Sequence, residues 1–366
     1  MFNKKDYKKN AYMLTGKYGK KGYDWWWHSF TASDEEGNEK PFFIEFFIIN
    51  PKLSPAEIKF GRLGMKPSYL MVKCGCWGNK AVQLHRFFKL NDVKINKCPY
   101  KIEADDCYLD DTTLKGKVSV FNSKEHKEYM CDDGSMEFDL KIEKDISFNV
   151  GYGTSPLLRK IKAFEMYWHA EGIKSRYSGT VIFNGKKYNV IPDKSYGYQD
   201  KNWGSNFTSP WLWLASSNIY SNISHKKLLN TAFDIGGGRP KIFFLPLDRK
   251  LLGVLYLEGK EYEFNFSKFW HRCKTAFDVA ETDEDIIWHV KQQAKGYIME
   301  TNIRCHKKDM LLVNYEAPNG LKLHNRLWNG GNGFGNIKLY KKKNMELIED
   351  LDVKNVGCEY GEYDKK

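Results

Sequence analysis

The densest group of residues that could do chemistry lies in Tyr196–Trp213, with the sequence YGYQDKNWGSNFTSPWLW. It places one carboxyl group, that of Asp200, among several tyrosine and tryptophan rings. Burial beside aromatic rings disfavours the anion of a carboxylic acid and raises its pKa, so such a group can donate a proton near neutral pH. A structural role is the alternative, in which Asp200 pairs with Lys201 or caps a turn with Asn202.

A second acid interrupts the apolar sequence FFIEFFII of Phe42–Ile49. Strand alternation places Glu45 on the same face as Phe43 and Phe47. An unpaired buried carboxylate is costly, so we expect Glu45 to be protonated, bonded to a lysine or arginine, or at the polar wall of a pocket.

Two histidines follow aromatic runs. In the sequence WWWH, alternation sends Trp25 and Trp27 to one strand face and Trp26 and His28 to the other. One of these faces can fill a core while the other lines a cavity, where His28 could act as a general base. His169, which follows Tyr-Trp, is a similar candidate. Either histidine can equally be an ordinary hydrogen-bonded residue.

Strands must position these groups, because short aromatic and β-branched runs alternate with turn signals along the chain. Asn184-Gly185 lies between two such runs and is a strong hairpin signal, and Glu258-Gly259 repeats the plan. Turns every 8–12 residues or so are typical of sandwiches and barrels rather than βαβ units. The sequence therefore predicts an all-β fold of about twenty strands.

Twenty strands in 366 residues suit two barrel-like domains better than one. The sequence GYGTSP, which begins at Gly151, interrupts the strand pattern and marks the expected boundary. We expect a basic N-terminal arm, two β-domains and an acidic C-terminal tail, with the bounds 1–24, 25–160, 161–345 and 346–366.

Composition and charge exclude several classes of protein. Hydrophobic residues make up 42% and charged residues 28%, which permits a packed core and excludes general disorder. No apolar run approaches the roughly 18 residues of a membrane-spanning helix, and MFNKKDYKKN lacks the apolar core of a signal peptide. We therefore expect a cytoplasmic location.

The net charge of +12 is unevenly distributed, since the first 23 residues hold seven lysines against Asp6. Solvated termini are the simplest interpretation. Contact of the basic arm with an anionic membrane surface is the alternative, and no nucleic-acid partner is expected.

Several familiar chemistries lack their motifs. The eight cysteines form no C-x-x-C pair and no zinc spacing, so we expect reduced thiols and no metal site. The glycines at 236–238 are not followed by a phosphate-loop lysine, and neither G-x-S-x-G nor H-E-x-x-H occurs. Aromatic β-surfaces also bind sugars or single-stranded nucleic acid by stacking, and this weaker alternative stays open.

The segment from Tyr196 to Ile219 resembles the signature of the tocopherol cyclase-like family, in which an acidic residue precedes Lys-Asn-Trp-Gly, a polar stretch and a tryptophan-rich strand. The matching residues here are Asp200, Lys201, Asn202, Trp203, Gly204, Trp211, Trp213 and Asn218. The likeness extends from Tyr167 to Tyr340. Carotenoid 1,2-hydratases (hydroxyneurosporene synthases) and lipocalin-like pericyclases share the architecture.

This resemblance implies two lipocalin-like antiparallel β-barrel domains around an apolar cavity, with no cofactor. In a tocopherol cyclase an acid protonates a prenyl double bond and a phenol oxygen captures the cation, whereas in a hydratase water captures it. By this resemblance Asp200 is the expected proton donor for a small apolar substrate, and aromatic faces would stabilise the cation.

Tyr198, Glu45 and His28 complete the set of expected acid–base residues. The expected substrate contacts are Asn202, Trp203, Trp211, Trp213, Trp26, Tyr196 and His169. A non-catalytic lipocalin-like carrier of a lipid or pigment is the alternative function.

Overall fold

The computed structural model describes residues 9–53, 65–148, 160–243, 245–321 and 323–362. Its elements in these ranges are antiparallel β-strands and short 3-10 helices, which confirms the all-β fold class. No described helix is long and apolar enough to cross a membrane.

A first sheet takes up the N-terminal part of the described chain and contains twelve strands. Their order is β4-β3-β2-β1-β11-β10-β9-β8-β7-β6-β5, and β12 pairs with both β1 and β10. The strands are β1 (Tyr23–Ser33), β2 (Glu39–Ile49), β3 (Tyr69–Cys76), β4 (Val82–Phe88), β5 (Lys94–Lys97), β6 (Tyr100–Ala104), β7 (Cys107–Asp110), β8 (Thr113–Val120), β9 (Gly134–Phe148), β10 (Met166–Phe183), β11 (Lys186–Val190) and β12 (Gly197–Gly204).

A second sheet, also of twelve described strands, follows with the order β20-β19-β16-β13-β26-β25-β23-β22-β21. In addition, β14 pairs with β15 and β26, and β24 pairs with β25. The strands are β13 (Trp211–Ser216), β14 (Asn218–Ser221), β15 (Lys226–Leu228), β16 (Thr231–Gly238), β19 (Lys250–Leu257), β20 (Lys260–Asn265), β21 (Lys274–Glu281), β22 (Asp285–Gln293), β23 (Tyr297–His306), β24 (Leu311–Glu316), β25 (Leu323–Lys341) and β26 (Glu346–Gly361).

The remaining elements are short. A two-stranded ribbon of β17 (Lys241–Ile242) and β18 (Leu245–Pro246) stands apart from both sheets. The 3-10 helices are η2 (Gly16–Gly19), η3 (Leu90–Asp92), η4 (Lys127–Tyr129), η5 (Pro192–Lys194), η6 (Phe269–His271) and η7 (Lys307–Asp309).

Both hairpins expected from the sequence are present. Asn184 and Gly185 join β10 to β11, and Glu258 and Gly259 join β19 to β20. All four residues have positive φ angles, as the two-residue turn that matches strand twist requires.

Buried apolar side chains form three cores, which we name by position. The first core lies within the first sheet and contains Trp26, the second core lies within the second sheet and contains Leu212, and the shared core contains residues of both sheets. Trp25 and Trp27 belong to the shared core, opposite Trp26, so the expected alternation along this strand is confirmed.

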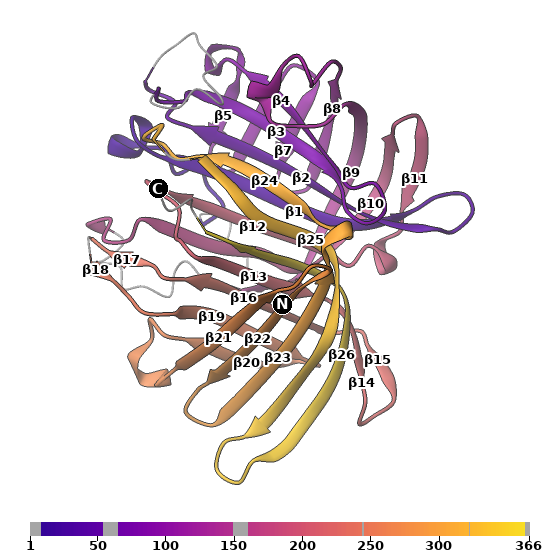
Figure 1. Ribbon diagram of the computed structural model, residues 1–366, viewed down its shortest axis with the longest axis vertical. Coiled ribbons are helices and arrows are strands. Elements are labelled where there is room, and N and C mark those ends of the chain that lie inside the picture. Colours follow the sequence, from indigo (N-terminus) through magenta and orange to yellow (C-terminus); the bar gives the residue numbers. More distant parts are fainter. Residues whose placement is uncertain (1–8, 54–64, 149–159, 244, 322, 363–366) are drawn as a thin grey trace.

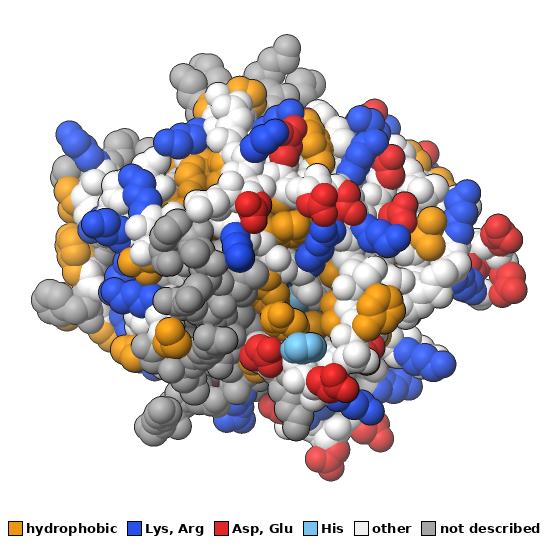
Figure 2. All heavy atoms as spheres, turned by 90° about the horizontal axis from the view of Figure 1, so that it is seen from above, with side chains coloured by type: hydrophobic (Ala, Val, Ile, Leu, Met, Phe, Trp, Pro, Cys, Tyr) orange, Lys and Arg blue, Asp and Glu red, His pale blue; other side chains and the backbone are white. Residues whose placement is uncertain are grey.

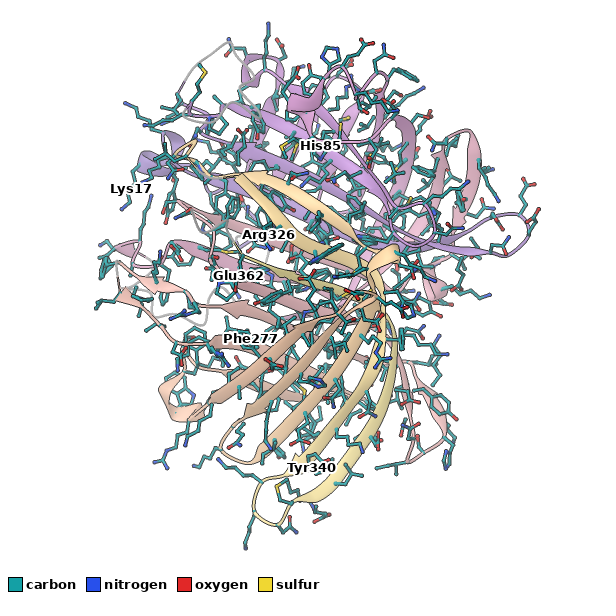
Figure 3. The ribbon with its side chains drawn as sticks, in the orientation of Figure 1. Lys17, His85, Phe277, Arg326, Tyr340 and Glu362 are labelled. Atoms are coloured by element: carbon teal, nitrogen blue, oxygen red, sulfur yellow. The ribbon has the colours of Figure 1, made fainter. Side chains whose placement is uncertain are left out.

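The two sheets lie one above the other in Figure 1, and β25 links them. Tyr340 lies at the lower end of β25 and Arg326 lies near the first sheet (Figure 3). Strands β10 and β16 also contact each other across the sheets. The shared core is therefore enclosed by strands from both halves of the chain.

The expected domain bounds do not coincide with the change of sheet. The boundary sequence at 151–159 lies outside the described residues, but β10, β11 and β12 belong to the first sheet, so the chain changes sheet between Gly204 and Trp211. The segment expected to be an acidic tail forms β26, which pairs with β13 and β25. Its charged residues alternate with buried apolar ones, as in a strand with one face in water.

Part of the expected basic arm packs on the protein. Residues 1–8 lie outside the described residues, whereas Tyr12, Leu14 and Tyr18 are buried in the first core. In the view of Figure 2, acidic and basic side chains are interspersed over the middle and right of the face, and the charged side chains at its left are mainly basic. We keep membrane contact by the arm as a prediction.

Candidate active site

Strand β12 carries the expected proton donor, and all eight of its residues are buried. It pairs with β1 on one side and β10 on the other, so both of its edges are covered. Successive side chains point to opposite faces of a strand. Tyr198, Asp200 and Asn202 therefore face the shared core, while Gln199 and Lys201 face the first core.

Asp200 is 5% exposed and accepts hydrogen bonds from two residues of the first sheet, one of which connects it to the second sheet. The indole N–H of Trp168 on β10 donates to its Oδ2 at 2.7 Å, and the Tyr198 hydroxyl lies 3.2 Å from the same oxygen. The Tyr198 hydroxyl also lies 3.3 Å from Oδ2 of Asp234, a fully buried residue of β16. The Trp213 indole N–H lies 3.1 Å from the Tyr198 oxygen and 3.2 Å from Oδ1 of Asp234.

The Tyr198 hydroxyl joins two carboxyl groups but has only one proton to donate. If it donates to one of them, the other carboxyl must carry its own proton to bond with the Tyr198 oxygen. Burial raises the pKa of Asp200 and of Asp234 well above the usual range, and the negative charge of Asp200 raises that of Asp234 further. The geometry of the shared hydroxyl and the desolvation of both carboxyl groups therefore favour a state in which Asp200 or Asp234 is protonated.

Lys201 does not neutralise Asp200. Its ammonium group forms a buried ion pair with Asp24 and lies 3.8 Å from the centre of the Trp26 ring, on the first-core face. Lys201 thus points away from Asp200, and the alternative of a pair between these two neighbours is wrong. Oδ1 of Asp200 has no hydrogen-bond partner among the described residues.

Glu359 on β26 is a third acid of this region and is partly exposed. The Trp211 indole N–H donates to its Oε2 at 2.8 Å, and the Asn329 amide donates to its Oε1. Asn329 is held in turn by the Trp77 indole N–H at 2.7 Å. Desolvation raises the pKa of Glu359 to about 7, although the two N–H donors oppose this rise.

Glu45 is bonded to a lysine, one of the states expected from the sequence. Its Oε2 lies 3.3 Å from Lys73 Nζ and accepts a hydrogen bond from Tyr315 at 3.0 Å, and both charged side chains are fully buried. Glu45, Trp27 and Asp200 are register partners on β2, β1 and β12, so they form one row across the sheet. Two acids of the shared core are thus separated by one indole ring.

Two small apolar clefts lie in this region, and Glu359 lines one of them. One has a volume of about 70 Å³ and is lined by Trp168 and Trp211, and the other, of about 20 Å³, is lined by Trp211, Tyr315 and Glu359. Met166, Thr208 and Trp211 line both, so the clefts adjoin. No group of three or more potential metal ligands is present among the described residues.

A model of the tocopherol cyclase-like family matches residues 112–362. The chain belongs to the tocopherol cyclase-like family. This confirms the resemblance seen in the sequence and extends it toward the N-terminus, to the start of β8. No curated protein sequence matches the chain.

Solved structures resemble this tocopherol cyclase-like protein along most of its length, at low identity. An AttH-like protein from Nitrosomonas europaea has 10% identity and a TM-score of 0.49, with 93% of each chain covered. Kievitone hydratase from Nectria haematococca has 11% identity and a TM-score of 0.48, over 92% of this chain and 88% of that one. CghA has 10% identity and a TM-score of 0.44, over 94% and 90%.

The family signature contributes residues to both faces of its strand. Asn202 lies on the Asp200 face, where its amide oxygen can accept from the Trp25 indole N–H at 3.0 Å and its NH₂ group can donate to the Tyr167 carbonyl at 3.3 Å. Trp203 lies on the opposite face, in the first core, and stacks on Tyr167. The signature thus serves both the site and the packing of β12.

The two histidine candidates lie on the first-core side of the sheet, with Trp26. His28 Nδ1 is 2.9 Å from the Tyr177 hydroxyl, and burial lowers the pKa of His28 to about 3. Burial also lowers the pKa of His169 well below its usual value. Both imidazoles are therefore neutral, and β12 separates them from Asp200.

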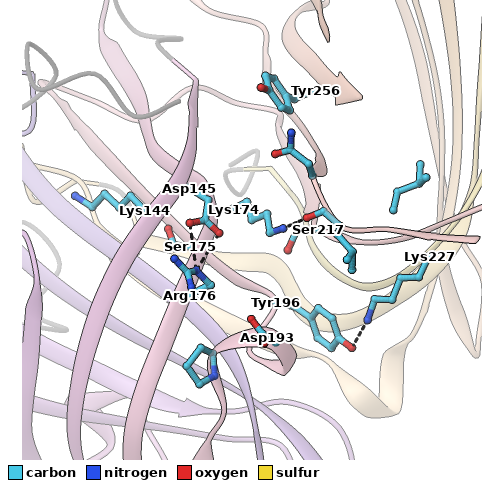
Figure 4. Close-up of a pocket in the computed structure, with 14 residues that line it drawn as sticks. Lys144, Asp145, Lys174, Ser175, Arg176, Asp193, Tyr196, Ser217, Lys227 and Tyr256 are labelled. Carbon is cyan, nitrogen blue, oxygen red and sulfur yellow. Dashed lines mark hydrogen bonds and ion pairs between the residues drawn. The ribbon is translucent and has the colours of Figure 1, made fainter. Parts of the chain in front are cut away.

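Tyr196 precedes β12 and lies at the molecular surface. Its hydroxyl accepts a hydrogen bond from Lys227 at 2.8 Å, at the edge of a polar cleft of about 800 Å³ (Figure 4). The basic side chains of this cleft include Arg176, which pairs with Asp145. The structure therefore places Tyr196 at this polar cleft and not at the apolar clefts lined by Trp211.

Sequence reasoning missed Trp168, Asp234 and Glu359. A single acid in the apolar sequence TAFDIGGG marks Asp234 in the same way that FFIEFFII marks Glu45, so alternation could have found it. In the sequence Tyr-Trp-His, the prediction chose His169 as a site residue and not its neighbour Trp168. Glu359 was hidden by the interpretation of its segment as a tail.

Proposed function

We propose that this protein is a cofactor-free acid catalyst that protonates a carbon–carbon double bond of an isoprenoid or similarly apolar substrate. An oxygen nucleophile then captures the cation, in a cyclisation or a hydration. Membership of the tocopherol cyclase-like family supports an enzyme of this class. The observation that carries the proposal is the pair of buried carboxyl groups joined through Tyr198.

Protonation of an alkene requires an undissociated acid, since a carboxylate has no proton to give. Asp200 is the proposed donor, and its Oδ1 is the oxygen left for a transferable proton. The hydrogen bonds from Trp168 and Tyr198 to Oδ2 would stabilise the anion that remains after transfer.

A tertiary cation formed here would be surrounded by aromatic rings. Trp25, Trp27, Trp168, Trp211 and Trp213 all belong to the shared core or line its clefts. The faces of such rings attract a cation by about 0.5–2 kcal/mol each. The same rings exclude water until a nucleophile is bound.

Substrate entry requires the clefts to widen. Their volumes of about 70 and 20 Å³ are below the roughly 300–1,000 Å³ of ordinary small-molecule sites. Met166, Thr208 and Trp211 border both clefts, so movement of these side chains would join them. The joined cleft would also have to extend past the Trp168 ring to reach Asp200.

The test is turnover of a prenylated hydroquinone in D₂O by the wild type and by Asp200→Asn. The amide keeps the shape and an oxygen for Trp168 but has no acidic proton. We expect product with one new C–D bond from the wild type and a loss of about 10²–10⁴-fold in the variant, measured by mass spectrometry. Asp285→Asn, a change to a partly buried carboxyl group of β22 that lines neither cleft, is the matched control and should keep its activity.

Unchanged turnover by Asp200→Asn would refute the proton-donor role. If the wild type binds the hydroquinone in native mass spectrometry but never converts it, the carrier function gains instead.

A further inference from the structure

The proposed reaction needs a proton acceptor as well as a donor. When a hydroxyl oxygen captures the cation, it forms a C–O bond and must lose its proton. A base with an ordinary carboxylate pKa would be weak, and efficient general bases have a pKa near the working pH. The acceptor must also border the space where the cation forms.

Glu359 meets the requirement of position. It borders the 20 Å³ cleft together with Trp211, and that indole also borders the 70 Å³ cleft beside Trp168. The rings of Trp168 and Trp211 are 5.9 Å apart, in an edge-to-face arrangement. The Trp168 indole therefore binds the proposed donor, the Trp211 indole binds Glu359, and the 70 Å³ cleft is lined by both indoles.

The hydrogen bonds of Glu359 differ from those of Asp200 in a way that assigns opposite roles. Both oxygens of Glu359 accept from N–H groups, of Trp211 and of Asn329, and such donors stabilise the anion. Asp200 has one oxygen without a described partner and shares the Tyr198 hydroxyl with a second acid. These hydrogen bonds therefore favour the carboxylate form of Glu359 and the protonated form of Asp200.

The charged and titratable groups around Glu359 are compatible with this role. Glu45 on β2 raises its pKa and Lys73 on β3 lowers it, so these two neighbours oppose each other. Its charge in turn raises the pKa of Asp200 on β12 and of Tyr315 on β24. The outcome is a pKa of about 7, where a base is both available and effective.

We propose that Glu359 is the general base of the site and takes the proton from the hydroxyl group that captures the cation. This inference rests on the proposed function. The O–H bond of Asp200 breaks as a C–H bond forms from the alkene electron pair. The nucleophile then forms its C–O bond and its O–H bond breaks, with the proton moving to Glu359. Exchange with solvent returns a proton to Asp200 and removes one from Glu359.

Glu45 is the other carboxylate that could serve, but its surroundings are less suitable. It is bound to Lys73 and Tyr315, and it does not line either cleft. Proton uptake by Glu45 would also leave the buried ammonium of Lys73 without its partner, which is costly.

The test separates protonation from capture by running Glu359→Gln in D₂O with the same prenylated hydroquinone. Without the base, the cation forms but loses a proton again. We therefore expect deuterium in the recovered substrate while the rate of product formation falls about 10²-fold or more. Asp200→Asn should give neither labelled substrate nor product, and Asp285→Asn should give normal product.

Product formation at the wild-type rate by Glu359→Gln would overturn the base role, and so would a folded variant that lost both labelling and product. Activity of Asp200→Asn would instead refute the proposed function, so the two failures are distinguishable. Near-ultraviolet circular dichroism reports whether each variant is folded.

Asn329→Leu provides a second variant that keeps Glu359. Removal of an N–H donor raises the pKa of a carboxyl group, so the rising limb of the pH–rate profile should move upward by about one unit. Glu359 must be deprotonated to act, so activity should increase with pH through about 7 in the wild type and through a higher pH in Asn329→Leu. A limb at the same pH in both proteins would contradict the assignment.

Discussion

At the scale of single residues, the site depends on one hydroxyl group placed between two acids. Tyr198 can satisfy both Asp200 and Asp234 only if one of them is protonated. Two effects thus act together, since desolvation makes the charged forms costly and the shared hydroxyl selects a state with a proton in place.

Removal of this hydroxyl by Tyr198→Phe should weaken the acid. The lost hydrogen bond stabilised the Asp200 anion, so the pKa of Asp200 rises further and proton transfer slows, by about 10-fold for each pKa unit. Leaving buried groups unsatisfied should also cost about 1–3 kcal/mol of stability, measured by urea unfolding.

Tyr177→Phe is the matched control for this prediction. It removes a buried hydroxyl that contacts His28 and the Tyr198 carbonyl on the other face of the sheet. A similar stability loss without a loss of turnover is expected. Equal turnover in both variants would contradict the role of the shared hydroxyl.

At the scale of elements, three glycines of the second sheet make room for three indoles that hold the polar groups of the site. A Cβ atom at any of these glycines would overlap the facing indole ring. The pairs are Gly236 with Trp168, Gly357 with Trp213 and Gly331 with Trp77. Close approach of these rings to the backbone, and not a special backbone angle, explains these glycines. Trp168 approaches Gly236 from the first sheet, whereas Trp213 lies on β13, the strand that pairs with the strand of Gly357.

Gly236→Ala should therefore displace the Trp168 ring and break its hydrogen bond to Asp200. We expect a lower rate of product formation together with about 1–3 kcal/mol lower stability, the usual cost of overpacking. Gly296→Ala is the control, because no atom lies within 4 Å of an added Cβ there. Wild-type kinetics in Gly236→Ala would show that Trp168 does not position the acid.

Alternation within strands was predictable from sequence, and relations between strands were not. The period of two correctly divided Trp25 and Trp27 from Trp26, and it put Asp200 and Lys201 on opposite faces. Nothing local to β12 indicates that Asp234 and Glu359 face the same core, because that depends on how the two sheets meet. The acidic residues of β26 also concealed its apolar face, so the sequence predicted a tail where the structure has a strand.

At the scale of the whole molecule, the site exists only where the two sheets close on each other. Asp200 comes from the first sheet, and Asp234 and Glu359 come from the second. Desolvation, the main cause of the raised pKa of Asp200, is therefore a property of the folded chain. In the unfolded chain Asp200 should ionise with the ordinary aspartate pKa of about 3.9.

Infrared difference spectroscopy between the wild type and Asp200→Asn at neutral pH tests the protonation of Asp200 most directly. The account predicts that the variant lacks a C=O band of a protonated carboxyl group, and that the same band disappears from the wild type on unfolding in urea. Asp234→Asn identifies any contribution from the second acid. A difference spectrum that shows only the loss of a carboxylate band would contradict the account.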